Sequence, residues 1–244
     1  LERLPVFDAV FHLAAKVNVD ESIKNPWVFV DTNIKGTLNV VMSCVMGNPT
    51  RLIMASSCEV YGNGEELDEN SALNPQSPYA ASKLGAERMA YALAHTHCFK
   101  LDIVRPFNVF GPRQKSKMFG AVIPILFDKA ANGLPMTIFG SGNQGRDFIH
   151  VTDVVEGYIN ILNNPKNGLT NIYTFGTGKL TTVNEIAQLI KQIIPESTIE
   201  YLPARPGEVQ GFTAKHTLPD YFPNIKTKTF EQGMREYYEH CVPK

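Results

Sequence analysis

Three side chains, Ser57, Tyr79 and Lys83, have types and spacing suited to proton transfer. Tyr79 and Lys83 are four residues apart, so on a helix the phenol and the ammonium share one face. A phenol titrates near ~10, and an adjacent cation lowers that pKa, so we expect an acid or base that works near neutral pH. Ser57 follows an apolar run, where its hydroxyl could hydrogen-bond a reacting oxygen. The spacing alone leaves open a Tyr–Lys pair on a solvated helix surface.

The elements that must position these residues alternate between strand and helix patterns. Short apolar runs predict buried strands over 7–13, 52–55 and 101–104. Apolar residues at steps of three or four predict a helix over 26–46, and Ser77-Pro78 begins a second helix that runs to about residue 97. Continuously apolar strands joined by helices indicate parallel pairing with right-handed crossovers, so we expect a doubly wound α/β fold. Such folds bind ligands at the carboxyl ends of their strands, where Ser57 lies.

The second half of the chain mixes the two patterns. It predicts strands over 136–139, 172–175 and 199–202, and helices over 153–162, 182–194 and 229–241. Thr182 and Glu185 have the spacing of a capping box at the start of one of these helices. We therefore expect a smaller mixed α/β lobe after the parallel sheet.

Composition excludes several classes of protein. Of the 244 residues, 43% are hydrophobic and 19% charged, which predicts a folded core. The net charge of -1 argues against binding to nucleic acid or a membrane surface, and no apolar run reaches the ~18–20 residues that span a bilayer. The four scattered cysteines and the lack of a signal-peptide pattern favour a cytoplasmic location. We expect no metal site, because His95 and His97 diverge on the predicted helix.

Six segments together resemble the extended short-chain dehydrogenase/reductase family, specifically its NAD-dependent nucleotide-sugar epimerases and dehydratases. They lie at 11–15, 32–37, 56–62, 79–83, 105–112 and 146–150, in the family's order. The resemblance implies a partial, Rossmann-like NAD(P)-binding domain over 1–110, to which segments near 140–175 could return. The nucleotide-sugar lobe is then mainly 111–244. Catalysis is implied for Ser57, Tyr79 and Lys83.

The family's glycine-rich turn near the N-terminus is absent from the sequence. We therefore expect an N-terminally incomplete member. Whether this chain by itself binds cofactor or turns over substrate stays open. The GxGxxG pattern at 140–145 precedes no helix start, so we assign it to a substrate-side loop.

The resemblance also implies binding residues. The cofactor, NAD, is assigned to Ala14, Ala15, Lys16, Asn33, Ser56, Tyr79, Lys83 and Phe107. The nucleotide sugar is assigned to Ser57, Glu59, Asn108, Val122, Thr137, Phe139, Arg146, Arg205, Glu208 and Phe212. Arg146 and Arg205 match phosphate-clamping arginines, whose guanidinium forks suit bidentate contacts, although surface ion pairs are an alternative. Phe139 matches a base-packing position or belongs to ordinary strand core. Asn33 is either near the cofactor or on a helix surface.

The residues after Ser57 bear on the reaction. Similar 4,6-dehydratases have Asp-Glu there, whereas this chain has Cys58-Glu59, and a thiol is poorly suited to protonate a leaving hydroxide. We expect a 4-epimerase of the UDP-glucose/UDP-galactose type, which oxidises sugar C4 transiently. Glu59 leaves a dehydratase or decarboxylase of the same family open, and a non-catalytic nucleotide-sugar-binding fragment is a further alternative. A bulky Phe212 favours plain UDP-hexoses over N-acetylated sugars.

Small residues on the second long helix suggest a homodimer. They are Ala81, Gly85, Ala86, Ala90 and Ala94. Relatives commonly pair the helices equivalent to 26–46 and 78–97, although some of these residues must pack on the sheet instead.

Overall fold

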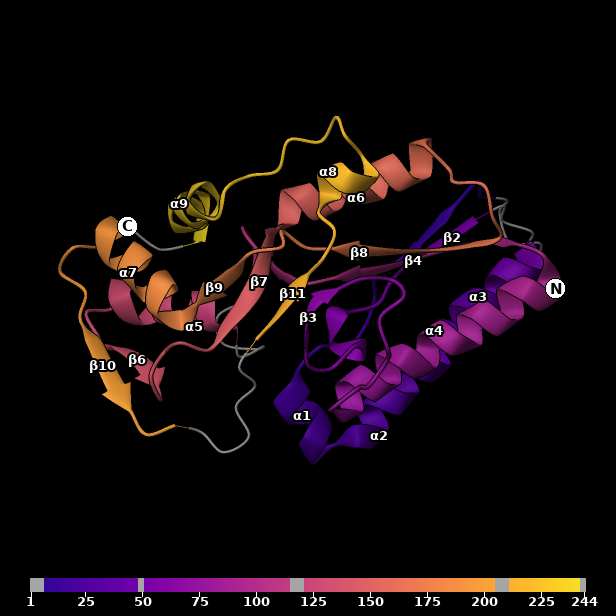
Figure 1. Ribbon diagram of the computed structural model, residues 1–244. Helices are drawn as coiled ribbons and strands as arrows, with labels where there is room; N and C mark the ends of the chain where they lie inside the picture. Colours follow the sequence, from indigo (N-terminus) through magenta and orange to yellow (C-terminus); the bar gives the residue numbers. More distant parts are fainter. Residues whose placement is uncertain (1–6, 48–50, 115–120, 205–210, 242–244) are drawn as a thin grey trace. The chain divides into compact units, whose positions relative to one another are not determined.

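The computed structural model describes residues 7–47, 51–114, 121–204 and 211–241 (Figure 1). The chain forms two compact units. The first is built from the described parts of Leu1–Gly62, Asp68–Pro106 and Gly157–Phe175, and the second from those of Asn63–Leu67, Phe107–Glu156 and Gly176–Lys244. Each unit therefore draws on several separate stretches of the sequence.

The first unit contains a four-stranded parallel sheet in the order β1-β2-β4-β8. Its strands are β1 (Val10–His12), β2 (Arg51–Ala55), β4 (Lys100–Pro106) and β8 (Thr170–Phe175). The parallel pairing predicted from the apolar runs is confirmed. β1 is shorter than the predicted 7–13, and β4 continues through Pro106, which lies opposite Phe175 in β8.

The helices of the first unit flank this sheet. They are α1 (Val19–Lys24), α2 (Pro26–Phe29), η1 (Val30–Lys35), α3 (Gly36–Gly47), the 3₁₀ turn η2 (Cys58–Val60) and α4 (Pro78–His97). α4 is confirmed at both ends: the Ser77 side chain accepts from the Ala80 amide at its start. The predicted regular helix over 26–46 is wrong in its middle, where η1 is a π-helix.

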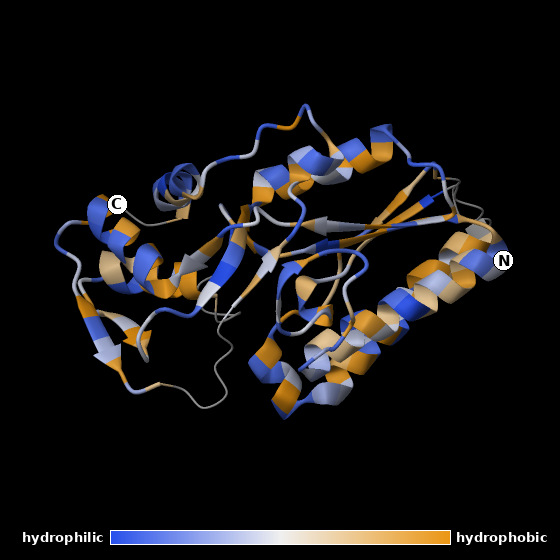
Figure 2. Ribbon diagram, viewed as in Figure 1, coloured by the Kyte–Doolittle hydropathy of each residue, from blue (hydrophilic) through white to orange (hydrophobic). Residues whose placement is uncertain are grey.

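Helices cover both faces of the sheet, which is the doubly wound arrangement. α3 and α4 carry both hydrophobic and hydrophilic residues (Figure 2), and their buried side chains pack on one face. This core comprises Val41, Cys44, Ala86, Ala90, Ala94, Leu52, Met54, Leu101 and Ile103. On the other face Tyr158, from the later turns of α6 (Val151–Asn163), makes edge contacts with Phe11 and Phe175. Three of the buried alanines of α4, Ala86, Ala90 and Ala94, therefore pack on the sheet.

The second unit combines small sheets with helices. β5 (Asn108–Phe110), β7 (Gly145–His150) and β9 (Leu180–Thr182) form one sheet, while β6 (Met136–Phe139) pairs with β10 (Ile199–Leu202), and β3 (Gly64–Leu67) with β11 (Phe212–Ala214). Its helices are α5 (Val122–Ala131), α7 (Val183–Ile193), α8 (Leu218–Tyr221) and α9 (Phe230–Cys241). The Thr182–Glu185 capping box is confirmed.

The structure also bears on the segment at 140–145 and on membrane-spanning helices. The GxGxxG segment at 140–145 leads into strand β7 and not into a helix, as expected. Across the described ranges, no helix combines the length and apolarity needed to cross a membrane.

Candidate active site

Tyr79 and Ser57 meet where α4 begins and β2 ends. Ser57 follows β2 and caps the short turn η2, where its oxygen accepts from the Glu59 amide at 3.2 Å. Tyr79 lies in the first turn of α4, and a hydrogen bond joins its phenol to the Ser57 side chain. Phe29 packs edge-on against the Tyr79 ring, with 6.4 Å between centroids. Both polar side chains are less than a tenth exposed, so the pair is held in a largely dry setting.

Lys83 lies one helical turn after Tyr79 and is equally buried. Its Nζ donates to the backbone oxygen of Ala55, the last residue of β2, at 2.6 Å. Burial lowers the pKa of Lys83 to about 8, although the Glu87 carboxylate acts in the opposite direction. The ammonium is therefore only moderately favoured over the neutral amine near neutral pH.

The electrostatics of Tyr79 differ from the sequence expectation. Burial raises the pKa of Tyr79 to about 12; the hydrogen bond with Ser57 lowers it, while Cys58 and Glu59 raise it further. The expectation that Lys83 brings this pKa toward neutrality is wrong for the protein alone. The physical reason is that burial takes the phenolate out of water and so favours the neutral phenol.

Asn33 ties the loop after β1 to the start of α4. It is 1% exposed, and its Oδ1 accepts from the Lys16 amide at 2.8 Å. Its Nδ2 donates to the Lys16 carbonyl at 3.0 Å and to Ser82 Oγ at 2.8 Å. Ser82 Oγ in turn donates to the Tyr79 carbonyl at 2.7 Å. The alternative of a solvated helix position is wrong for Asn33.

The other predicted cofactor residues of the first unit lie in the segments that follow β1 and β2. Ala14 is exposed and Ala15 half-buried in the loop that Asn33 holds, and the Lys16 ammonium pairs with Glu21 at 2.6 Å. Ser56 is 5% exposed, and among the described residues its hydroxyl has no hydrogen-bond partner. A buried hydroxyl without a partner is costly, so this position suits a bound group that supplies one.

Sequence reasoning missed a buried ion pair beside these residues. Glu87, one turn after Lys83, accepts from Arg105 Nε at 3.0 Å and from Arg105 Nη2 at 2.7 Å. Arg105 Nη1 also donates to the Tyr61 hydroxyl at 3.1 Å. Both charged side chains are 1% exposed. The four-residue step from Lys83 to Glu87 was the signal that could have found the pair.

The second unit brings together three of the predicted binding residues. The guanidinium carbon of Arg146, on β7, lies 5.1 Å from the centroid of the Phe212 ring. Phe107 packs on the same ring, with 5.7 Å between centroids. Phe212 is only 3% exposed, whereas Arg146 is half-buried. The guanidinium therefore lies over the Phe212 ring, and Phe107 supports that ring.

A buried carboxylate, Asp147, fixes the surroundings of Arg146. Asp147 accepts from the Thr177 amide at 2.9 Å and hydroxyl at 2.6 Å, from the Gly178 amide at 2.9 Å and from the Ala214 amide at 3.1 Å. The Asp147 carbonyl accepts from Asn108 Nδ2 at 3.1 Å. This carboxylate thus holds β11, which carries Phe212, against β7. Sequence reasoning did not single it out.

The remaining predicted substrate residues are dispersed. Val122 begins α5 and is half-buried against the core of the second unit. The Thr137 hydroxyl is bonded by Lys129, and Phe139, half-buried at the end of β6, accepts from Gln144 Nε2 at 2.8 Å through its carbonyl. Arg205 and Glu208 lie outside the described residues.

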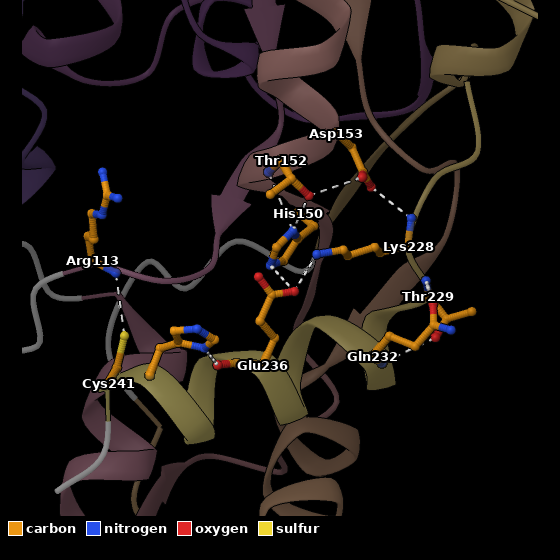
Figure 3. Close-up of polar contacts among 10 residues, drawn as sticks. Arg113, His150, Thr152, Asp153, Lys228, Thr229, Gln232, Glu236 and Cys241 are labelled. Atoms are coloured by element: carbon orange, nitrogen blue, oxygen red, sulfur yellow. Dashed lines mark hydrogen bonds and ion pairs between the residues drawn. The ribbon is translucent and has the colours of Figure 1, made fainter. Parts of the chain in front are cut away.

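A polar cluster attaches the C-terminal part of the second unit to the end of β7 (Figure 3). Asp153 accepts from the Lys228 amide at 3.0 Å, and the Lys228 ammonium pairs with Glu236. His150 Nε2 lies 3.9 Å from Glu236 Oε2, and its Nδ1 is 2.8 Å from Thr152 Oγ1. Burial and then Lys228 lower the pKa of His150, which favours the neutral ring. The cluster anchors α9 to the strand that carries Arg146.

Comparisons with known proteins identify the family of this chain. The family model described as "NAD dependent epimerase/dehydratase family" matches residues 2–176. A putative UDP-glucose 4-epimerase of Methanocaldococcus jannaschii is 39% identical over 190 residues, which are 77% of this chain and 61% of that relative. Human dTDP-D-glucose 4,6-dehydratase is 34% identical over 195 residues, covering 79% of this chain and 54% of that enzyme.

A solved structure shows the same architecture. The UDP-glucose 4-epimerase of Thermotoga maritima, crystallised with UDP-glucose, superposes with a TM-score of 0.87 at 29% identity, over 96% of this chain and 76% of that one. The expected Rossmann-like α/β class is confirmed by this match. The chain spans about three fifths of the length of the first curated relative. It belongs to the NAD dependent epimerase/dehydratase family.

Proposed function

We propose that the protein is an NAD-dependent nucleotide-sugar 4-epimerase of the UDP-glucose/UDP-galactose type. The observation that carries this proposal is the buried Ser57–Tyr79 hydrogen bond, with the Lys83 ammonium one turn away at the end of β2. Phenol, hydroxyl and amine at this sheet end suit removal of a proton from a sugar hydroxyl. An epimerase returns the hydride that it takes, and it needs no further acid or base.

The residues of the first unit fit the nicotinamide side of NAD. The Ser56 hydroxyl lacks a partner among the described residues, and Lys83 uses one of its three protons on Ala55. Ser56, Tyr79 and Lys83 would hold this end of the cofactor, and the loop fixed by Asn33 would line it. Bound NAD supplies a hydride acceptor and donor. Tyr79, once it has lost its own proton to solvent, would take the hydroxyl proton as a phenolate while Ser57 orients the reacting oxygen. The Lys83 ammonium and the positive charge of oxidised NAD would favour this phenolate.

The residues of the second unit support recognition of a nucleotide diphosphate. Arg146 places its guanidinium over the Phe212 ring, and Phe107 packs on that ring. This arrangement suits a planar contact of the guanidinium with phosphate oxygens. We propose the same role for Arg205 and ribose recognition for Glu208, by resemblance. Phe212 remains our candidate for selecting UDP-hexoses over N-acetylated sugars. Because its ring is buried, we propose that it acts through the position of Arg146.

Product analysis in deuterated water tests the reaction. An epimerase should convert UDP-glucose to UDP-galactose without deuterium in the sugar, because the hydride returns from the cofactor. The matched control is Tyr79→Phe, which keeps the ring and removes the hydroxyl. A product that has lost one water, or carries solvent deuterium at C5, would exclude the epimerase assignment.

A second candidate is a dehydratase of the same family. Glu59 is partly buried and raises the pKa of Tyr79, so its carboxylate acts on the proposed reaction centre. A carboxylate there could remove the C5 proton, the step that leads to loss of water. Glu59→Gln separates the two candidates: an epimerase should keep most of its turnover, whereas a dehydratase should lose it.

We also propose a homodimer formed through α3 and α4. Beyond the alanines that pack on the sheet, these helices expose Met42, Met46, Met89 and Tyr91. Exposed large apolar residues on neighbouring helices are typical of interfaces. Light scattering at tens of micromolar should give twice the chain mass, and Met89→Glu should lower it. A monomer under these conditions would exclude this dimer.

A further inference from the structure

The first unit buries more charge around Lys83 than proton transfer by Tyr79 requires. Glu87 and Arg105 are each 1% exposed, and Lys83 is 6% exposed. Removing such groups from water is costly, and a buried ion pair contributes little to stability unless its geometry is nearly complete. This pair satisfies that condition, because two parallel bonds link the guanidinium to the carboxylate. The bonds within the pair therefore account for its own burial, and the buried charge that remains to be explained is that of Lys83.

The helix places the carboxylate of the pair one turn from the lysine. Glu87 follows Lys83 by four residues on α4, so both side chains leave the same face of the helix. Arg105 comes from the sheet, on β4, and the Tyr61 hydroxyl accepts one of its protons at 3.1 Å. Tyr61 is itself bonded to Thr174 Oγ1 of β8 at 2.8 Å. The carboxylate is thus held between helix and sheet and cannot turn away.

We propose that Glu87 is a positioning residue for the Lys83 ammonium: its carboxylate keeps a negative charge beside the lysine, and Arg105 fixes that carboxylate. The inference rests on the proposed function for its use in catalysis. The arrangement makes Lys83 a cation despite its burial. Without the carboxylate, burial and the remaining Arg105 charge would both favour the neutral amine.

The other titratable groups around Lys83 do not supply this charge. His12, on β1, is 2.8 Å from Thr37 Oγ1, and burial followed by the Lys83 charge lowers the pKa of His12. A neutral imidazole offers no counter-charge. Tyr79, on the same helix, is a neutral phenol, because its pKa is about 12. Arg105, on β4, is a cation. Glu87 is the group whose charge favours the Lys83 ammonium.

Titration of Lys83 by NMR tests the inference without any turnover. The chain is labelled at lysine side chains with ¹³C and ¹⁵N, and Lys83→Arg identifies the Lys83 signal by its loss. In Glu87→Gln the midpoint should fall by about 1–3 pH units from the wild-type value of about 8. The matched control is Asp31→Asn, which removes an exposed carboxylate at the same four-residue spacing from Lys35 and should leave Lys83 unchanged.

Glu87→Gln leaves Arg105 buried without its counter-charge, so this variant requires a check of folding by circular dichroism. If it does not fold, Glu87→Gln/Arg105→Met removes both charges, and the Lys83 midpoint should still fall because the carboxylate is the charge that favours the Lys83 ammonium. A folded variant of either kind with an unchanged midpoint would overturn the inference. Tyr61→Phe, which changes no charge, should leave the midpoint in place.

Measurements of turnover then show whether catalysis depends on the influence of Glu87 on the protonation of Lys83. The alkaline limb of the pH–rate profile should move to lower pH in Glu87→Gln by the same amount as the NMR midpoint. An unchanged limb in a folded variant whose NMR midpoint has shifted would separate Glu87 from catalysis. Turnover that Tyr79→Phe leaves unchanged would count against the proposed function, whereas the NMR result would stand.

Discussion

The Ser57–Tyr79–Lys83 group of the first unit and the Arg146–Phe212 group of the second are held in different ways. Each member of the first group is less than a tenth exposed and bonded to a fixed partner. In the second group only the ring is buried, and the half-buried guanidinium rests on it. In the first group burial raises the pKa of Tyr79 and lowers that of Lys83, and perturbed pKa values of this kind are typical of functional sites. The proposed phosphate contact requires an accessible cation. The Phe212 ring lies on one side of the Arg146 guanidinium, which stays half-buried.

Tyr79→Phe should produce the largest loss of turnover, and it tests the buried Ser57–Tyr79–Lys83 group. Loss of the phenol removes the proposed proton acceptor and leaves the ring packed against Phe29. We expect turnover of UDP-glucose to fall by roughly 10²–10⁴. Binding of UDP should be unchanged, because the phenol belongs to the first group. A loss of less than about tenfold would remove Tyr79 from the chemistry.

Asp147→Ala should destabilise the second group most. It leaves the amides of Thr177, Gly178 and Ala214 without their buried acceptor, so the free energy of unfolding should fall by about 3 kcal/mol. Thr177→Val is the control, since it removes one donor and should cost about 1 kcal/mol. Urea unfolding measures both. Equal costs would show that Asp147 does not organise this region.

Lys83→Met should stabilise the protein in a pH-dependent manner. Because burial lowers the pKa of Lys83 to about 8 from the ordinary 10.5, the wild-type protein gains stability as the pH rises through this interval. Below pH 8 the buried cation is a full cost. The variant should therefore be more stable by about 1–3 kcal/mol at pH 7, and this advantage should shrink toward pH 10.

Urea unfolding at both pH values measures the difference, with exposed Lys35→Met as the control. A variant that is less stable than wild type at pH 7, or whose advantage persists at pH 10, would contradict the lowered pKa of Lys83.

Arg146→Lys should have the smallest effect, a change in the Kd for UDP, and it tests the Arg146–Phe212 group. A lysine keeps the charge but loses the planar fork that stacks on Phe212. We expect the Kd for UDP, measured by calorimetry, to rise about tenfold, which is ~1.4 kcal/mol. Arg88→Lys, at an exposed position of α4, should leave it unchanged. Equal Kd values in the two variants would argue against a phosphate contact at Arg146.

Local signals allowed much of the fold to be predicted. Ser77-Pro78 and the capping box at Thr182 fixed helix starts, because caps depend on neighbouring residues alone. The apolar runs located the parallel strands for a similar reason. The interruption at η1 could not be read this way, since it depends on the contacts of Asn33 with distant residues. Strand β7 was missed because its polar residues, such as Asp147, are buried through tertiary hydrogen bonds.

In the candidate site, too, features set by local sequence could be predicted, whereas features set by tertiary contacts could not. Residue types and spacing suggested Ser57, Tyr79 and Lys83 as a group, and the family resemblance favoured this group over a solvated surface pair. In the structure two of them share a helix and the third follows a strand. Their pKa values could not be predicted, because burial is a property of the whole unit. Glu87 was overlooked because its partner, Arg105, comes from another element. The roles of the binding residues and the domain division at residue 110 stay predictions.

The π-helix η1 has a consequence for how this sequence can change. A π-turn holds one residue more than an α-turn, so η1 amounts to a single extra residue inside the helical stretch from Pro26 to Gly47. That residue gives Asn33 its inward position beside Lys16 and Ser82. Deleting it would restore a regular and better-bonded helix and release the loop after β1. The irregularity therefore marks a place where regular helical hydrogen bonding is given up for a tethered loop.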